Sequence, residues 1–354
     1  MIRSIVAVAA AVLVVASISG ATEVPPEPIE TAMPAPRFGA VESGAFSAAG
    51  VRKRRIPLGA SAPHWARRLY SRSVRILVAL TDPRSGAMIA GERDGWDYVW
   101  PRDAAAGAIA LAAAGLRPEA RRVASFLSNV DTERAARFYP DGSPVPGRPS
   151  AGDAAGWVAL AEQAVHGRGR IVLPNGRVAT PSQDGADGWR DQQDYGENVT
   201  GDLLGNAITA GVPAAEIRSR FITSRGLVRE EGHSELDSAA AWAATLFPSR
   251  DLRGAVRSTL LRFTHESTPF GIPPIEGWTP GEVWTAPTAW SAWALSELGE
   301  IRAADRLLAE LHNAETVHGT LPERVDASTG APASTTPLGW SHAFAILALR
   351  ARYG

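Results

Sequence analysis

Eight consecutive residues, 96–103, concentrate side chains that suit the binding of a neutral ligand rich in hydroxyl groups. They are Trp-Asp-Tyr-Val-Trp-Pro-Arg-Asp, with two indoles, a phenol, a guanidinium and two carboxylates. Flat aromatic rings cover the C–H faces of a sugar, while charged groups hold its hydroxyls. A structural role also fits, with the aromatic rings in the core and Asp103 as the N-cap of a following helix. Composition alone leaves both interpretations open.

Three further stretches, at 181–198, 276–285 and 318–342, again combine acids with aromatic rings. Their principal members are Trp189, Asp191, Glu197, Trp284, Glu323 and Trp340. Hydrolysis of a glycosidic bond needs two carboxyl groups, one protonated to donate to the leaving group and one ionised to activate water or to attack. The separate loops therefore offer the acids that this reaction requires.

Apolar residues at helical spacing predict eleven helices that position these loops. The helices cover about 62–82, 104–114, 118–127, 153–166, 198–210, 214–222, 235–247, 251–264, 286–298, 301–313 and 337–352. No strand alternation separates them, so the predicted fold class is all-α, built from helix hairpins. Long loops recur at 82–102, 131–150, 168–196, 266–285 and 314–336. If the hairpins stack in a ring, these loops gather at one end and form a pocket.

The composition of the chain excludes several classes of ligand. The 354 residues hold 36 basic and 37 acidic side chains, so there is no surplus positive charge to attract nucleic acid. Cysteine is absent and the seven histidines lack metal-ligand spacing, so we expect no metal and no cofactor. His342, at a helix start, is expected to contact substrate or cap the helix. We expect a monomer.

The N-terminal sixty residues are expected to lie outside the helical domain, which we place at 61–354. Residues 1–21 carry an apolar run at 5–18 and a small-residue site, which predicts a signal peptide and a secreted or extracytoplasmic protein without stable membrane association after cleavage. An uncleaved anchor is the alternative, although the run is short for a bilayer crossing. Residues 22–60 predict a linker, whose basic run at 52–55 is either solvated or docks on an anionic surface.

The motifs resemble those of glycoside hydrolase family 15, the glucoamylase-type enzymes. Residues 96–103 are similar to the family's aromatic signature ending in Arg-Asp. Leu-Pro-Glu-Arg-Val-Asp at 321–326, with Leu-Gly-Trp-Ser-His at 338–342, resembles its second catalytic segment. Asp-Pro-x-x-Gly-Ala-Met-Ile-Ala at 82–90 and Trp-Thr-x-x-Thr-x-Trp at 284–290 resemble two further motifs. The four occur in the family's order, and the resemblance spans about 62–352.

This resemblance implies an (α/α)6 barrel, here in a short version, and inverting cleavage of an α-linked glucosyl unit from the non-reducing end of an oligo- or polysaccharide. Glu323 would be the general base that activates water. The terminal sugar would be held by Tyr98, Trp100, Arg102 and Asp103, with Trp189, Trp284 and Trp340 as further binding residues. Inversion implies carboxyl groups roughly 6.5–9.5 Å apart.

The general acid departs from the family pattern. Where the family usually has Asp-x-Trp-Glu-Glu, this chain has Asp-Tyr-Gly-Glu-Asn at 194–198. Glu197 keeps the spacing and is the expected acid, with Asp191 as the reserve candidate. Two other functions stay open: a phosphorylase on the same type of barrel, in which phosphate replaces activated water, and a carbohydrate-binding relative without catalysis.

Overall fold

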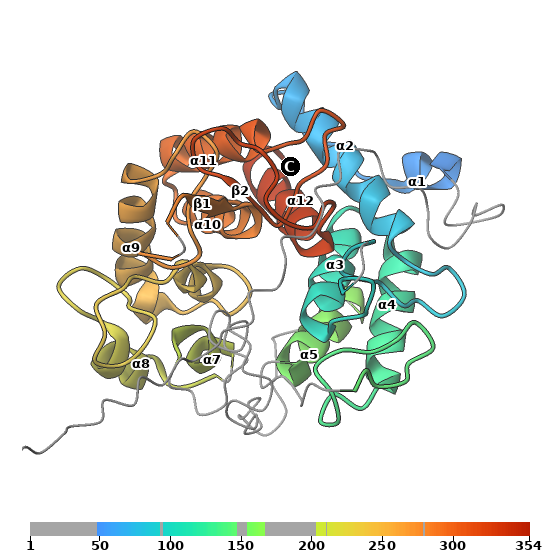
Figure 1. The fold of residues 1–354 in the computed structure, drawn as a ribbon, viewed down its shortest axis with the longest axis horizontal. Coiled ribbons are helices and arrows are strands. Elements are labelled where there is room, and N and C mark those ends of the chain that lie inside the picture. The colour runs from blue at the N-terminus through green and yellow to red at the C-terminus, as the bar shows by residue number, and fades with distance from the viewer. Residues whose placement is uncertain (1–47, 93–94, 147–153, 167–202, 210, 279) are drawn as a thin grey trace, which may run out of the picture.

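The computed structural model describes residues 48–92, 95–146, 154–166, 203–209, 211–278 and 280–354. Helices dominate these ranges and form a ring of two concentric layers (Figure 1). The inner layer consists of α3 (Pro101–Ala113), α5 (Ala154–His166), α7 (Leu204–Thr209), the 3₁₀ helix η3 (Ser238–Ala244), α10 (Thr285–Glu297) and α12 (Gly339–Tyr353). Successive inner elements touch: α5 packs on α3, α3 on α12, α12 on α10, α10 on η3 and η3 on α7.

The outer layer, within the same ranges, consists of α2 (His64–Ala79), α4 (Arg117–Asn129), α8 (Ala214–Phe221), α9 (Arg253–His265) and α11 (Ile301–Asn313). Each packs against the inner helix before or after it in the chain. The outer helices are amphipathic and turn arginine-rich faces outward, whereas α3, α10 and α12 are apolar nearly all round and are buried on nearly every side. The apolar pattern thus separates the two layers.

Small residues let the layers approach closely. Gly107 in α3 lies against Met88, whose Sδ atom would be 2.2 Å from an added Cβ. Gly115 and Gly299 follow α3 and α10 with φ values of 88° and 82°, a left-handed conformation that ends helices and favours glycine. These turns join inner to outer helices as short hairpins.

Most predicted helices are present, with four differences. The 235–247 helix is the shorter 3₁₀ helix η3, and of the 198–210 helix the described part is α7. Two three-residue strands, β1 (Glu282–Trp284) and β2 (Arg324–Asp326), pair antiparallel where no strand was expected. The predicted linker also contains structure, because α1 (Ala48–Arg54) packs on the ring and buries Val51.

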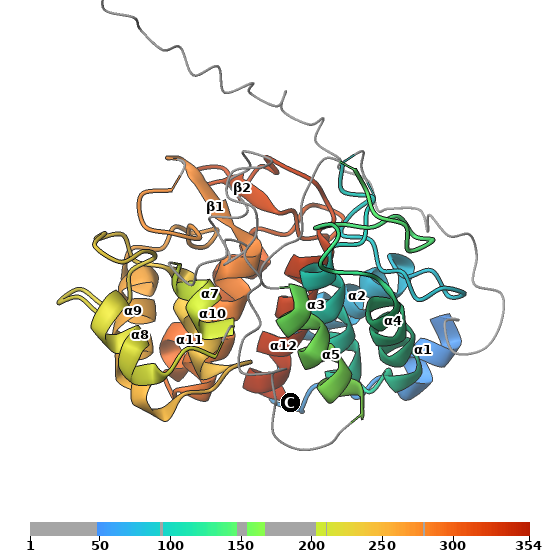
Figure 2. The same ribbon diagram turned by 90° about the horizontal axis from the view of Figure 1, so that it is seen from below.

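The loops gather at one end of the ring. Figure 2 shows β1, β2 and the long loops at that end and the C-terminus at the other. An (α/α)6 barrel has twelve helices, one more than the eleven predicted, so the sequence leaves a twelfth helix either within 131–150 or 168–190 or trimmed away. Residues 131–146 form turns, and residues 147–150 and 168–190 lie outside the described residues, as does the predicted signal peptide. Among the described residues, no helix combines the length and apolarity needed to cross a bilayer.

Candidate active site

Three inner helices begin at the loop end and aim their first residues at one space. Trp100, Trp284 and Leu338 directly precede α3, α10 and α12, each with extended backbone. Asp103 is the third residue of α3, in its first turn, and is therefore not the N-cap. The switch from extended chain to helix turns neighbouring side chains inward, so short segments from distant parts of the sequence meet.

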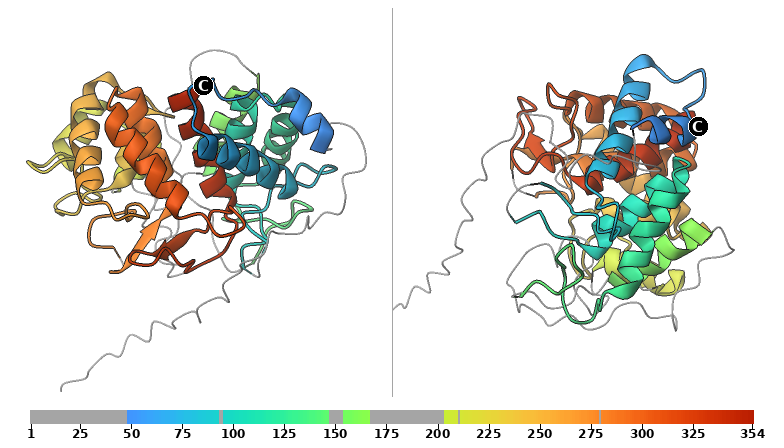
Figure 3. Two further views of the ribbon diagram at one scale, coloured as in Figure 1. Left: turned by 90° about the horizontal axis from the view of Figure 1, so that it is seen from above. Right: turned by 90° about the vertical axis from the view of Figure 1, so that its right-hand side faces the viewer.

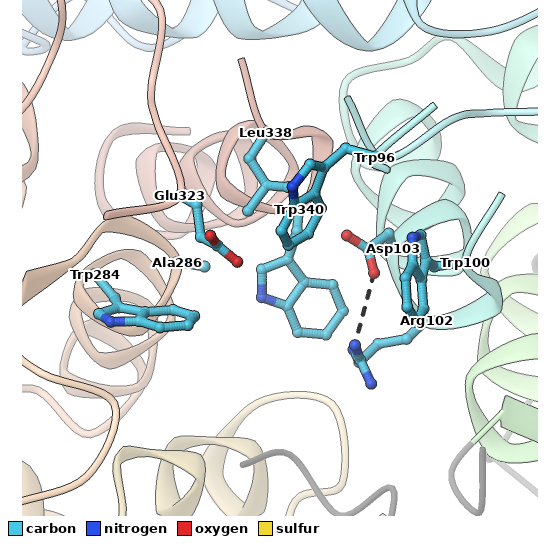
Figure 4. Close-up of a pocket in the computed structure, with 9 residues that line it drawn as sticks. All are labelled: Trp96, Trp100, Arg102, Asp103, Trp284, Ala286, Glu323, Leu338 and Trp340. Carbon is cyan, nitrogen blue, oxygen red and sulfur yellow. Dashed lines mark ion pairs between the residues drawn. The ribbon is translucent and has the colours of Figure 1, made fainter. Parts of the chain in front are cut away.

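These residues meet in a pocket that is lined by aromatic rings, by a few charged groups and by small apolar contacts (Figure 4). Its indoles are Trp96, Trp100, Trp284 and Trp340, its charged groups are Arg102, Asp103 and Glu323, and its small apolar contacts are Ala286 and Leu338. Figure 4 shows the Glu323 and Asp103 carboxylates pointing into this space from opposite sides, with the Trp340 indole between them. Aromatic walls with few, separated charges suit a sugar ring.

Arg102 and Asp103 form the charged wall. Their residues are only 8% and 7% exposed, and Arg102 Nε lies 3.9 Å from Asp103 Oδ2. The Arg102 guanidinium also lies 5.2 Å from the centre of the Trp340 ring, a cation–π distance. Because the two charges are largely removed from water, they present strong, oriented hydrogen-bonding groups to a ligand.

Trp340 gives the pocket a rigid floor. Its ring meets Trp157, Trp290 and Phe344 edge to face, with centroids 5.4, 6.0 and 5.0 Å away. Trp242 continues this aromatic cluster across the ring of helices, 5.6 Å from Trp290. The indole that faces the pocket is therefore held by the core itself.

Glu323 is positioned by the strand pair. Arg324, the first residue of β2, is paired with Trp284 of β1. At the adjoining position, Thr285 N donates to the Glu323 carbonyl (3.1 Å), and Glu323 N donates to the Thr335 carbonyl (3.0 Å). The Ser334 hydroxyl donates to Glu323 Oε2. The carboxylate is thus buried, 8% exposed, and has a fixed orientation.

His342 supports the same segment from below and faces no ligand, contrary to the expectation of substrate contact or capping. It is fully buried, its Nε2 accepts from Leu321 N (3.0 Å), and its Nδ1 lies 2.9 Å from Ser73 Oγ on α2. Burial lowers the pKa of His342 to about 3, so the ring is neutral at neutral pH. Nδ1 then carries the ring proton and donates a hydrogen bond to the Ser73 hydroxyl oxygen.

Replacing His342 with Ala is expected to lower the free energy of unfolding by roughly 2–4 kcal/mol, because it leaves a cavity and an unpaired Leu321 N–H. Ser73→Ala, which removes only the outer hydrogen bond, is expected to cost about 1 kcal/mol. Urea denaturation of both variants measures the difference. Equal losses would show that His342 does not hold the 321–323 segment.

Asp237 lies at the N-terminus of the inner element η3, and nothing in the sequence singled it out. Its carboxylate accepts from Ala239 N (2.8 Å) and caps η3, and the residue is 2% exposed. Burial raises the pKa of Asp237 from 3.8 to about 7. The folded protein therefore holds this proton at pH values where the unfolded chain has lost it.

Stability that depends on this proton is full below about pH 4 and declines as the pH rises to about 7. In Asp237→Asn, which cannot ionise, this decline is expected to vanish. The unfolding free energy of the variant minus that of the unchanged protein should rise between pH 4 and 7, by up to about 4 kcal/mol, and then level off. Urea denaturation across this pH range measures it, and a constant difference would contradict the assignment.

The predicted site residues fall into three groups. Trp100, Arg102, Asp103, Trp284, Glu323 and Trp340 line the pocket together. Tyr98 does not; its ring packs edge to face on Tyr139 at 5.5 Å, under Arg137. Glu197, Asp191 and Trp189 lie outside the described residues. Trp96 lines the pocket without having been chosen, although it opens the 96–103 stretch.

No protein-family model and no curated protein matches the chain. Several solved structures do align with the chain. A glycosidase variant in complex with glucose aligns at 18% identity over 80% of this chain and 96% of its own, with a TM-score of 0.61. A bacterial glucoamylase complexed with acarbose aligns at 16% identity over 80% and 55%, with a TM-score of 0.58. The glucoamylase of Saccharomycopsis fibuligera aligns at 15% identity over 81% and 94%, with a TM-score of 0.59.

These similarities show the fold: the chain is an (α/α)6 barrel of the glucoamylase type, as the motif resemblance predicted. The pocket described above lies at the end of this barrel where the inner helices α3, α10 and α12 begin.

Proposed function

We propose that the protein is a glycoside hydrolase that releases glucose from the non-reducing end of α-linked glucosides with inversion. The observation that carries the proposal is the pocket itself, in which Glu323, Arg102, Asp103 and four indoles converge at one end of a barrel shared with glycosidases. Two similar structures, a glycosidase and a glucoamylase, contain glucose and acarbose respectively.

Glu323 is the proposed general base. Its ionised carboxylate removes a proton from a water molecule as that water attacks the anomeric carbon, while Ser334 keeps Oε2 oriented. Arg102 donates hydrogen bonds to the hydroxyls of the terminal sugar and Asp103 accepts them, while Trp340 and Trp284 cover its apolar faces.

Glu197 is the proposed general acid, which protonates the leaving oxygen, with Asp191 as the alternative. This assignment rests on the spacing from Asp194 in the sequence. For an inverting enzyme the acid is expected roughly 6.5–9.5 Å from Glu323, leaving room for the attacking water. We further propose that residues 1–21 export the protein, so that it acts outside the cytoplasm.

The test is sugar release from a panel of α-glucosides, including trehalose, maltooligosaccharides and dextran, with and without phosphate. Glucose released without phosphate supports hydrolysis. Release of glucose 1-phosphate that requires phosphate would overturn it in favour of a phosphorylase. Thermal stabilisation by a glucan without any product would indicate a binding protein.

A further inference from the structure

The outer face formed by α1 and α2 is rich in positively charged side chains. Between Glu42 and Asp82 the chain has eight lysine and arginine side chains and no acid. Since the whole protein has a net charge of −1, the remainder of the chain carries an acidic surplus. The asymmetry is therefore local to this stretch of the sequence and does not follow from overall composition.

Five of these cations are exposed: Arg52, Lys53, Arg67, Arg68 and Arg75. Arg68 acts electrostatically on the carboxylate of Glu315, whereas no ion pair joins the other four to a carboxylate of the described residues. By contrast, Arg54 is paired with the buried Glu119 of α4, an ion pair that fastens α1 to the ring. The neighbouring Arg55 is held by Ser71 and by the Tyr70 ring. The helices are therefore fixed in place while the five cations face solvent.

The cations lie close enough to repel one another. The pKa of Arg75 is lowered by burial first, and then by the positive charges of Arg72, Arg55 and Arg52. The fold tolerates this repulsion, which a negatively charged surface would relieve. Ile56, between the basic residues of α1 and α2, is 43% exposed and adds an apolar contact to the same face.

The α1 part of this face lies toward the end of the barrel away from the pocket, whereas Trp65 near the start of α2 stacks on His312 at the end of α11. Gly59, between α1 and α2, donates to the carbonyl of Tyr353 at the end of α12, whereas α12 begins at the pocket. Figures 2 and 3 show α1 on the side of the ring that carries the C-terminus, with β1 and β2 at the opposite end. A partner on this face leaves the pocket open.

We propose that the α1–α2 face docks the protein on an anionic phospholipid surface. Scattered, unpaired cations beside an exposed isoleucine suit lipid headgroups and the shallow apolar layer beneath them. Of the two interpretations of the basic run 52–55, a solvated segment or docking on an anionic surface, the proposal adopts the second, and it differs from the expectation of no stable membrane association after cleavage.

The test is sedimentation of the full chain with vesicles of phosphatidylcholine containing 30% phosphatidylglycerol, compared with phosphatidylcholine alone. The quadruple variant R52Q/K53Q/R67Q/R68Q is expected to bind the anionic vesicles at least tenfold more weakly, because each cation near the surface contributes about fivefold. The matched control is R218Q/R250Q/R253Q/R262Q, which removes four exposed arginines from α8, from the 3₁₀ helix η4 (Arg250–Leu252) and from α9. It is expected to bind within twofold of the unchanged chain.

High salt is expected to abolish the difference between the two vesicle types. Equal binding of the quadruple variant and the unchanged chain to anionic vesicles would overturn the proposal. Binding to soluble dextran sulfate but not to the vesicles would also overturn it, in favour of a polyanionic polysaccharide partner. R67Q/R68Q, which leaves α1 intact, repeats the test if the quadruple variant does not fold.

Discussion

Glu323→Gln is expected to abolish glucose release from α-glucosides while leaving the fold intact. The amide oxygen can still accept from Ser334, and the backbone bonds of Glu323 to Thr285 and Thr335 do not involve the side chain. The amide cannot take a proton from water, and a positioned general base contributes about 10²- to 10⁴-fold to the rate. A fall of that size in kcat, measured from initial rates, is the expected result.

Glu266→Gln provides the matched control, because Glu266 is an exposed carboxylate at the end of α9. It is expected to keep full activity. If Glu323→Gln and Glu266→Gln turn over equally, Glu323 is not the base, and the interpretation of the pocket fails with it.

Asp103→Asn is expected to lower kcat/KM about 10- to 100-fold, since a hydrogen bond to a charged group is worth about 1.5–3 kcal/mol. Asp103 has its carboxylate at the pocket wall beside Arg102, and an amide there presents a donor where a sugar hydroxyl would donate. The loss should be smaller for substrates that lack the contacted hydroxyl. Kinetics with maltose and its deoxy analogues measure it.

Asp251→Asn, which changes an exposed carboxylate on η4, is the control and should match the unchanged protein. A variant at Asp103 with unaltered kinetics on every analogue would show that this carboxylate does not contact the terminal sugar.

The sequence was most informative about the helices. Apolar spacing predicts helices at 104–114 and 301–313; they are the inner helix α3, almost entirely Ala, Ile and Leu, and the outer helix α11, which has one apolar and one charged face. The structure confirms both, and it also brings Glu323 to the pocket that holds Arg102 and Asp103.

The features that the sequence did not predict depend on contacts between residues far apart in the chain. Strands of three residues, such as β1 and β2, are too short to show alternation, and their pairing joins residues 282 and 326. Tyr98 shares its stretch with Trp96 and Trp100, but Arg137 and Tyr139 from another loop hold its ring away from the pocket. His342 could not be placed because its partners, Ser73 and Leu321, come from two other parts of the chain.

The most direct test of the proposed mechanism is the configuration of the first product. Proton NMR recorded during hydrolysis of a maltooligosaccharide separates the two anomers of glucose before they equilibrate. Water activated by Glu323 attacks the face opposite the leaving group, so β-glucose is expected to accumulate first. Initial release of α-glucose would contradict inversion and the role of Glu323 as a base.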